Sequence, residues 1–153
     1  MKGPFESIVL QFIVRVFMLP FILLFALYVL VHGELSPGGG FQAGAIMAAA
    51  LLLGRICLDL QQTERWFPTS TLRALSVAGL LIFFLVGLVP VFNAGDFLDY
   101  AALPIPNDDG QVSPHFTLRS AGLFVVEVGI ALGVMASLTL IFDYLSENTR
   151  DAG

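Results

Sequence analysis

Long apolar stretches alternate with short polar ones along this chain, and four of the apolar stretches are long enough to cross a lipid bilayer. A membrane-spanning helix needs about 20 mostly apolar residues, because each residue advances the helix by about 1.5 Å. The pattern predicts an all-α integral membrane protein, a single membrane domain over residues 1–153 with four transmembrane helices. These four spans are approximately residues 8–31, 41–58, 72–92 and 120–144.

The three connections between these spans differ in composition. Residues 32–40 form a short glycine-rich stretch, whereas residues 59–71 contain charged side chains and the single tryptophan, Trp66. Residues 93–118 form the longest connection, with four aspartates and three prolines. Proline and the Asn-Asp-Asp-Gly sequence at 107–110 favour turns, so we predict a loop here and no soluble domain.

The basic residues predict the orientation of the chain in the membrane. With four spans, both termini and the second connection lie on the same side of the bilayer. Because Lys and Arg accumulate on the cytoplasmic side, we predict cytoplasmic termini and an external loop at 93–118. The opposite side carries only Arg119, whereas the predicted cytoplasmic side carries Lys2, Arg15, Arg55, Arg65, Arg73 and Arg150.

Composition excludes several classes of protein. Hydrophobic residues make up 57% of the chain, and the mean hydropathy is +0.87. Charged residues make up only 12%, against about 25% in soluble domains, which excludes a soluble globular protein. With 7 Lys+Arg against 12 Asp+Glu, the chain lacks a basic surface for nucleic acid. The chain has one cysteine, Cys57, and two histidines, His32 and His115. Because these are too few and too far apart in sequence for a recognisable metal or haem motif, we expect no metal site and no cofactor.

A glycine-rich motif joins the first two predicted spans. Consecutive glycines allow main-chain angles that other residues resist and let a neighbouring chain approach closely. The helix that follows begins with free N–H groups and a partial positive charge, which can hold an anion or a carboxylate. A tight helical hairpin is the simpler interpretation, and a functional interface is the alternative. The motif comprises His32, Gly33, Pro37, Gly38, Gly39, Gly40, Phe41 and Gln42.

With this motif the chain resembles the B subunit of the Mrp-type multisubunit cation/proton antiporters. That family carries an H-G-x-x-x-P-G-G-G-F-Q signature where its first helix ends and its second begins, and the signature is complete here. The last span is also similar, with Glu127 where many members have an aspartate directly after a phenylalanine. The resemblance implies a small companion subunit in a complex of several membrane proteins that exchanges Na+ for H+.

Glu127 is the candidate for a proton or cation site. A charged side chain at the centre of a span costs about 2.5–3.5 kcal/mol on insertion scales, so this acid must be protonated, paired or facing water. The functional hypothesis is that it forms part of a proton or cation path. The structural hypothesis is that it is protonated and hydrogen-bonds another helix.

Depth along the helices limits the partners of Glu127. It lies about 7 Å outside the membrane midplane, and Arg15 lies about 7 Å on the cytoplasmic side, so we predict that the two do not pair directly. Small residues at the level of Glu127 or beside it are expected to let the helices pack closely. These candidate packing residues are Gly44, Ala45, Ala48, Gly87 and Gly129.

Four charged residues receive structural interpretations. Arg55 and Asp59 are four residues apart at the end of the second span, where they can form an ion pair on one helix face. Arg15 is interpreted as extending to the cytoplasmic interface, with a contact to another subunit or an anionic lipid as the alternative. Asp143, at the end of the last span, is expected to be solvated.

Three functional hypotheses follow. The first is an integral membrane subunit of a hetero-oligomeric Na+/H+ antiporter in the bacterial cell membrane, which supports assembly and contributes to the ion or proton path. Its partners would be the other membrane subunits, the lipid bilayer, and Na+ and H+ as transported ions of the complex, and it would not be an enzyme. The second is a structural adaptor in a related respiratory or hydrogenase-type complex, and the third is an autonomous homo-oligomeric transporter.

Overall fold

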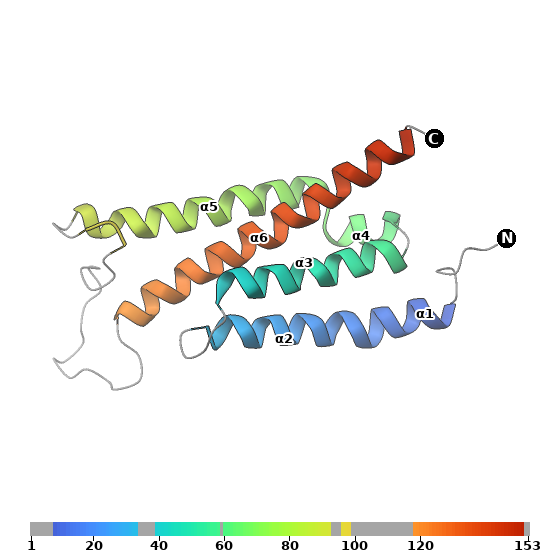
Figure 1. The fold of residues 1–153 in the computed structure, drawn as a ribbon, viewed down its shortest axis with the longest axis horizontal. Coiled ribbons are helices and arrows are strands. Elements are labelled where there is room, and N and C mark those ends of the chain that lie inside the picture. Colours follow the sequence, from blue (N-terminus) through green and yellow to red (C-terminus); the bar gives the residue numbers. More distant parts are fainter. Residues whose placement is uncertain (1–7, 34–38, 59, 93–95, 99–117, 152–153) are drawn as a thin grey trace.

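The computed structural model describes residues 8–33, 39–58, 60–92, 96–98 and 118–151 of the chain. These residues form helices joined by short connecting segments (Figure 1). Residues 14–18 form a π-helical turn, η1, within the first helical run. In chain order the elements are α1 (Ile8–Ile13), η1 (Val14–Met18), α2 (Leu19–Val31), α3 (Gly40–Cys57), α4 (Leu60–Trp66), α5 (Thr69–Phe92) and α6 (Leu118–Asp151).

The four long helical stretches confirm the predicted all-α membrane fold. Stretches Ile8–Val31, Gly40–Cys57, Thr69–Phe92 and Ser120–Glu147 are each long and apolar enough to cross a bilayer. The last helix continues to Asp151, and the short helix α4 lies in the connection between α3 and α5. Of the predicted loop 93–118, the structure describes only residues 96–98 and the first residue of α6.

The first span is one helical run interrupted by a widened turn. At η1 the N–H of Leu19 donates to the carbonyl of Val14, one residue further back than in an α-helix. Pro20 follows directly, and a proline both lacks an N–H and crowds the carbonyl four residues before it. The π-helical turn therefore accompanies the proline and contains Arg15.

Helix α6 is the central helix of the bundle. It packs against α5 on one side and α3 on the other, and α3 packs in turn against α2. In Figure 1 the beginning of α1, the helix α4 and the end of α6 lie at one end of the bundle. The end of α2 and the beginning of α3 lie towards the other end, so α3 and α6 run in the same direction.

Small residues set the distances between these helices. A Cβ atom on Gly79 of α5 would lie 2.5 Å from the carbonyl oxygen of Gly129 in α6, and a Cβ on Gly44 of α3 would lie 2.6 Å from that of Ala131. The main chains are thus in contact, as is typical of membrane helices joined by van der Waals packing. Beside the first contact, the hydroxyl groups of Ser76 and Ser137 are hydrogen-bonded at 2.8 Å.

The residues predicted to pack between helices occupy three different settings. Gly44, Ala48 and Gly129 are buried between helices, and Ala45 is half-buried. Gly87 is buried beneath the ring of Phe97, where its own Cβ would lie 2.6 Å from two ring atoms. Gly87 therefore provides space for the segment that follows α5.

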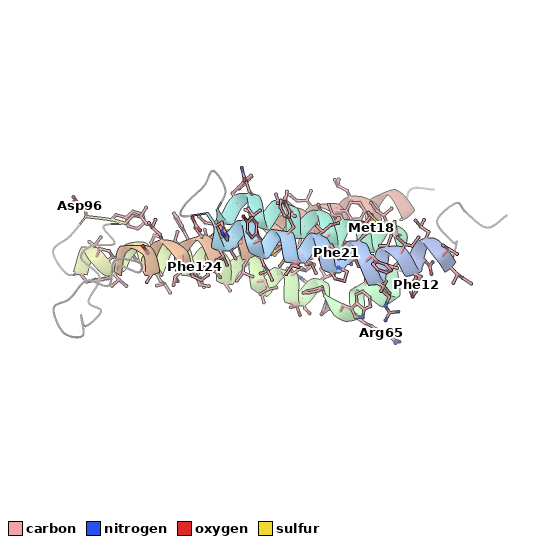
Figure 2. All side chains as sticks on the ribbon, turned by 90° about the horizontal axis from the view of Figure 1, so that it is seen from below. Phe12, Met18, Phe21, Arg65, Asp96 and Phe124 are labelled. Atoms are coloured by element: carbon pink, nitrogen blue, oxygen red, sulfur yellow. The ribbon has the colours of Figure 1, made fainter. Side chains whose placement is uncertain are left out.

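The outside of the bundle is covered by large apolar side chains (Figure 2). Along the first helical run Phe12, Phe21 and Leu24 are more than half exposed, and on α5 so are Leu80 and Leu85. A water-soluble protein does not expose apolar surface over its whole length. An apolar surface of this extent is suited to contact with lipid or with the apolar surfaces of other membrane proteins.

Replacing Gly79 with alanine should destabilise the bundle. The added methyl group would press on the main chain of α6, which cannot move aside without separating α5 from α6. We expect a loss of about 1–3 kcal/mol in the free energy of unfolding, measured by thermal unfolding of the full chain in mild detergent. Gly133→Ala is the matched control, because its Cβ would lie 3.9 Å from the nearest atom. Equal melting temperatures for both variants would contradict the packing argument.

Candidate functional site

The carboxyl group of Glu127 meets both ends of the connection between α2 and α3. A Cβ atom on Gly33, which follows α2, would lie 2.8 Å from Glu127 Oε2, and one on Gly39, which precedes α3, would lie 3.1 Å from Oε1. The acid therefore occupies space that a side chain at either glycine would need. The membrane carboxyl and the glycine motif, which the sequence suggested separately, form one site.

The glycines of this site have a geometric reason to be glycine. Gly39 has φ +97° and ψ −170°, a conformation that side-chain-bearing residues adopt only with strain. Gly40, the first residue of α3, has no room for a side chain, because its Cβ would overlap the main-chain oxygen of Glu127. A Cβ on Gly33 would lie 2.5 Å from the Cα of Gly39. The motif thus brings the first turn of α3 directly onto α6.

The beginning of α3 gives this site its electrostatic character. The N–H of Ala43 donates to the carbonyl of Gly39 at 3.1 Å, which leaves the N–H groups of the three preceding residues without acceptors inside the helix. Their partial positive charge favours an ionised carboxylate, whereas a protonated carboxyl group can itself donate a hydrogen bond. Within the described residues, no group of three His, Cys, Asp or Glu side chains could hold a metal ion.

Three other described residues of the motif, His32, Phe41 and Gln42, lie on either side of the same connection. The ring of His32 stacks on Tyr28 with centroids 4.1 Å apart, and its Nδ1 donates to the Tyr28 carbonyl at 3.2 Å. The side chains of Phe41 and Gln42 are exposed, and Phe41 borders an apolar groove of about 540 Å³ along α5 and α6. Pro37 and Gly38 lie outside the described residues.

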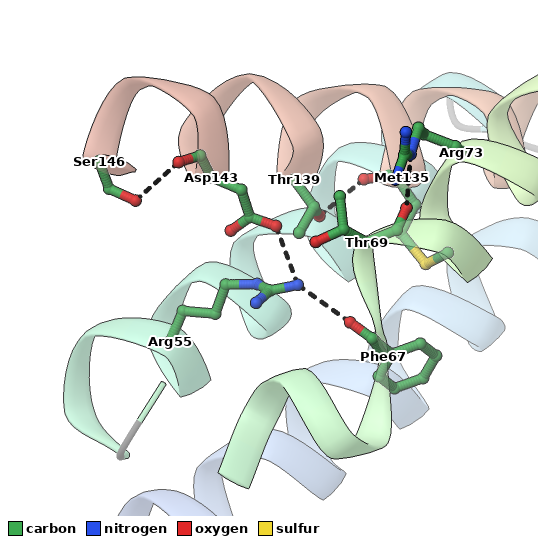
Figure 3. A network of polar contacts seen from close by, with 8 residues as sticks. All are labelled: Arg55, Phe67, Thr69, Arg73, Met135, Thr139, Asp143 and Ser146. Atoms are coloured by element: carbon green, nitrogen blue, oxygen red, sulfur yellow. Dashed lines mark hydrogen bonds and ion pairs between the residues drawn. The ribbon is translucent and has the colours of Figure 1, made fainter. Parts of the chain in front are cut away.

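A buried ion pair lies near the opposite end of α3 (Figure 3). Arg55 Nη2 is 3.0 Å from Asp143 Oδ2 of α6, and the side chains are 4% and 13% exposed. The same nitrogen donates to the main-chain oxygen of Phe67 at 3.1 Å. Arg55 therefore joins α3, α6 and the segment before α5.

Arg15 lies far from Glu127. It borders the same cavity as Gly54 and Arg55 near the end of α3, whereas Glu127 meets Gly40 at the beginning of α3. About 20 Å of helix separates these two positions. The placement agrees with the prediction that the two charges do not pair directly.

Comparison with known proteins identifies the family. A family model described as "Domain related to MnhB subunit of Na+/H+ antiporter" matches residues 9–140. The chain belongs to the MnhB family. A family relative in Staphylococcus saprophyticus, named "Putative antiporter subunit mnhB2", is 33% identical over 124 residues, which cover 78% of this chain and 86% of the relative. A protein of the same name in Staphylococcus aureus (strain Newman) is 32% identical over 122 residues, with the same coverage.

The MnhB match covers one of the two polar sites completely. It includes the described glycines of the motif and Glu127, and it ends before Asp143. The acid of the glycine site is therefore within the part of the chain that characterises the family. The Arg55–Asp143 pair combines one residue inside the matched region with one just beyond it.

Two sequence interpretations are corrected by the structure of this MnhB-family chain. Asp143 was expected to be solvated, but it is largely buried against Arg55. Glu127 was expected at the level of Gly44, whereas it lies at Gly40, one helical turn nearer the start of α3. The predicted partner of Arg55, Asp59, lies outside the described residues.

The sequence contains an indication that Asp143 could pair with Arg55. Arg55 lies near the end of the second predicted span and Asp143 near the end of the fourth, so the sequence predicts both on the same side of the midplane. The depth argument that separated Arg15 from Glu127 places these two at similar depth. A local pair four residues away is simpler to recognise, but an arginine can reach an acid on a neighbouring helix equally well.

Removing one member of the buried ion pair should destabilise the protein. Arg55→Leu leaves Asp143 without its counter-charge, and we expect a loss of about 3–5 kcal/mol in the free energy of unfolding, measured by thermal unfolding in mild detergent. The double variant Arg55→Leu/Asp143→Leu should recover most of this loss, because no charge then remains buried. Arg73→Leu, at an exposed arginine of α5, is the control. A double variant as unstable as the single one would show that the charge pairing is unimportant.

Proposed function

We propose that this chain is an integral membrane subunit of a multisubunit Na+/H+ antiporter and that Glu127 is the group through which it takes part in ion or proton movement. The role as an antiporter subunit is supported by family membership and by the four apolar helices. The role of Glu127 is supported by one observation, the position of its carboxyl group against Gly33 and Gly39 at the start of α3.

This position suits an acid that alternates between two protonation states. The partial positive charge of the helix start stabilises the ionised form, so that a proton can leave without exposing an uncompensated charge to the membrane interior. The protonated form can donate a hydrogen bond to a carbonyl oxygen. A monovalent cation can replace the proton, because it compensates the same negative charge.

The chain works as one component of a transport complex and not as an enzyme. One such acid in four helices provides little for a complete exchange cycle, so we assign the main ion paths to other membrane subunits. The apolar exterior of the bundle supplies surface for those subunits and for lipid. The glycine site supplies a proton or cation position beside them.

The proposed location is the cytoplasmic membrane of a bacterium, as a multi-pass protein. The similar proteins come from Staphylococcus species, and the distribution of basic residues supports cytoplasmic termini by the positive-inside rule. The glycine site then lies towards the external side of the membrane, and the Arg55–Asp143 pair lies towards the cytoplasmic side.

Glu127→Gln should abolish or strongly reduce exchange while leaving the complex assembled. Glutamine keeps the size and the hydrogen-bonding ability of the side chain, but it neither binds nor releases a proton. The measurement is Na+-dependent dissipation of a pH gradient in inverted membrane vesicles that contain the whole complex, together with copurification of its subunits.

Two further variants make this test specific. Glu147→Gln changes an exposed acid on the same helix and should leave exchange normal, whereas Glu127→Asp keeps the carboxyl group and should retain part of it. An assembled Glu127→Gln complex with full exchange would overturn the proposed role of Glu127 and favour a hydrogen bond that only joins helices.

Gly39→Ala should weaken the same site through the main chain. Alanine at φ +97° is strained by about 1–3 kcal/mol, and its methyl group would press on Glu127 Oε1. We expect reduced exchange and a lower melting temperature of the complex. Gly54→Ala is the matched control in α3, since its nearest contacts would be ordinary ones at 3.6 Å; if both variants behaved alike, the special geometry of Gly39 would be irrelevant.

A further inference from the structure

A second feature of the bundle, independent of the glycine site, is a cavity of about 280 Å³ near the end of α3. Its wall is largely apolar and is built by residues of α2, α3 and the α4–α5 segment, among them Leu19, Leu23 and Phe67. Arg15 and Trp66 border it as well. The cavity thus combines an apolar interior with a cation at its edge.

We propose that this cavity binds an anionic phospholipid, with the phosphate at the guanidinium group of Arg15 and an acyl chain along the apolar wall. Four observations support this site: the exposure of Arg15, its contact with Trp66, the charge balance of the cavity, and its place among the basic residues. Each of them concerns residues outside the glycine site.

Arg15 is an exposed cation on the apolar first span. It belongs to the π-helical turn Val14–Met18, which interrupts the α-helix and accompanies Pro20. In the described residues, the contact that the structure gives its guanidinium is with the ring of Trp66, whose centroid is 5.2 Å from Arg15 Cζ. A cation in this setting is stabilised by an anion at its exposed side, since charge in a membrane span is costly.

Trp66 marks the depth of the site. Tryptophan side chains collect at the level of lipid headgroups, where an amphipathic ring contacts both the acyl chains and the polar layer. Trp66 is 45% exposed, and its ring holds Arg15 by a cation–π contact. In this proposal the long side chain of Arg15 extends towards the headgroup level, where the phosphate of a phospholipid lies.

Two arginines border the cavity, and Arg15 is the one whose charge is available to a ligand. Arg55 also borders the cavity, but its charge is matched by Asp143 at 3.0 Å. Among the described residues, the structure shows no comparable ion pair for Arg15. An anionic ligand would therefore be attracted by Arg15, which borders the cavity.

The position of the cavity favours a lipid over a partner protein. It lies at the end of the bundle that carries Arg15, Arg55, Arg65 and Arg73, which the sequence assigns to the cytoplasmic side. Basic pockets between transmembrane helices on that side bind anionic headgroups, and the cytoplasmic leaflet is negatively charged. An acyl chain also fits a narrow apolar cavity better than a whole transmembrane helix does.

The test is a lipid titration of the purified, delipidated complex. Phosphatidylglycerol, phosphatidylcholine with the same acyl chains, and inorganic phosphate are added separately, and the melting temperature is followed at each concentration. We expect phosphatidylglycerol to raise the melting temperature more than phosphatidylcholine, and phosphate to have no effect. Arg15→Gln should weaken the apparent affinity for phosphatidylglycerol about fivefold, the effect of one basic residue near an anionic surface.

Control variants separate this site from general charge effects. Arg73→Gln removes another exposed arginine from the same end of the bundle and should leave the lipid response unchanged, whereas Arg15→Lys should retain most of it. If Arg15→Gln should fail to assemble, Trp66→Phe provides a milder variant that removes the indole and should also weaken the response.

Three results would overturn the proposal. Equal stabilisation by the two lipids would show that the headgroup charge is not recognised. A response to inorganic phosphate alone would indicate an anion site without lipid. Loss of one particular subunit from the Arg15→Gln complex, with an unchanged lipid response, would show that the cavity docks a protein.

Discussion

The contact between α3 and α6 organises this bundle, because α3 compensates the two described acidic side chains of α6 that are half-buried, Glu127 and Asp143. At one end, the carboxyl group of Glu127 lies at the start of α3, against main chain that only glycine permits. At the other end, Asp143 is paired with Arg55, close to the end of α3. The two helices run in the same direction. Glu127 therefore lies beside the partially positive start of α3, and Asp143 lies beside the positively charged Arg55 near the end of α3.

The compensation is of a different kind at each end. Glu127 meets the partial charge of a helix start, which is fixed in place and independent of pH. Asp143 meets a complete charge on a flexible side chain, held by a second bond to the carbonyl of Phe67. The first arrangement tolerates loss of the negative charge, whereas the second is destabilised when only one of its two charges is lost. This difference supports the proposed transport role of the glycine site and a stabilising role of the ion pair.

Much of the fold could be predicted from the sequence because the membrane imposes a simple rule. Apolar stretches of sufficient length become spanning helices, and the four predicted spans agree with the helices that are observed. Hydropathy does not state which helices touch, so the meeting of Glu127 with Gly33 and Gly39 was not apparent, although both features were recognised. The partner of Arg55 was missed for the same reason, since the four-residue spacing to Asp59 indicated a local pair. The π-helical turn before Pro20 depends on main-chain details that a residue pattern does not contain.

Because α6 is attached to α3 at two points, the number of residues between these two points is also fixed. Glu127 and Asp143 are sixteen residues apart, and Arg55 follows Gly40 by fifteen, so the attachments on the two helices are separated by about 23 Å in each case. Deleting or inserting one residue between them in α6 would turn one attachment by about 100° around the helix axis. Substitutions at exposed positions of this interval can be absorbed locally, but a change in its length would force one of the two acids out of its place.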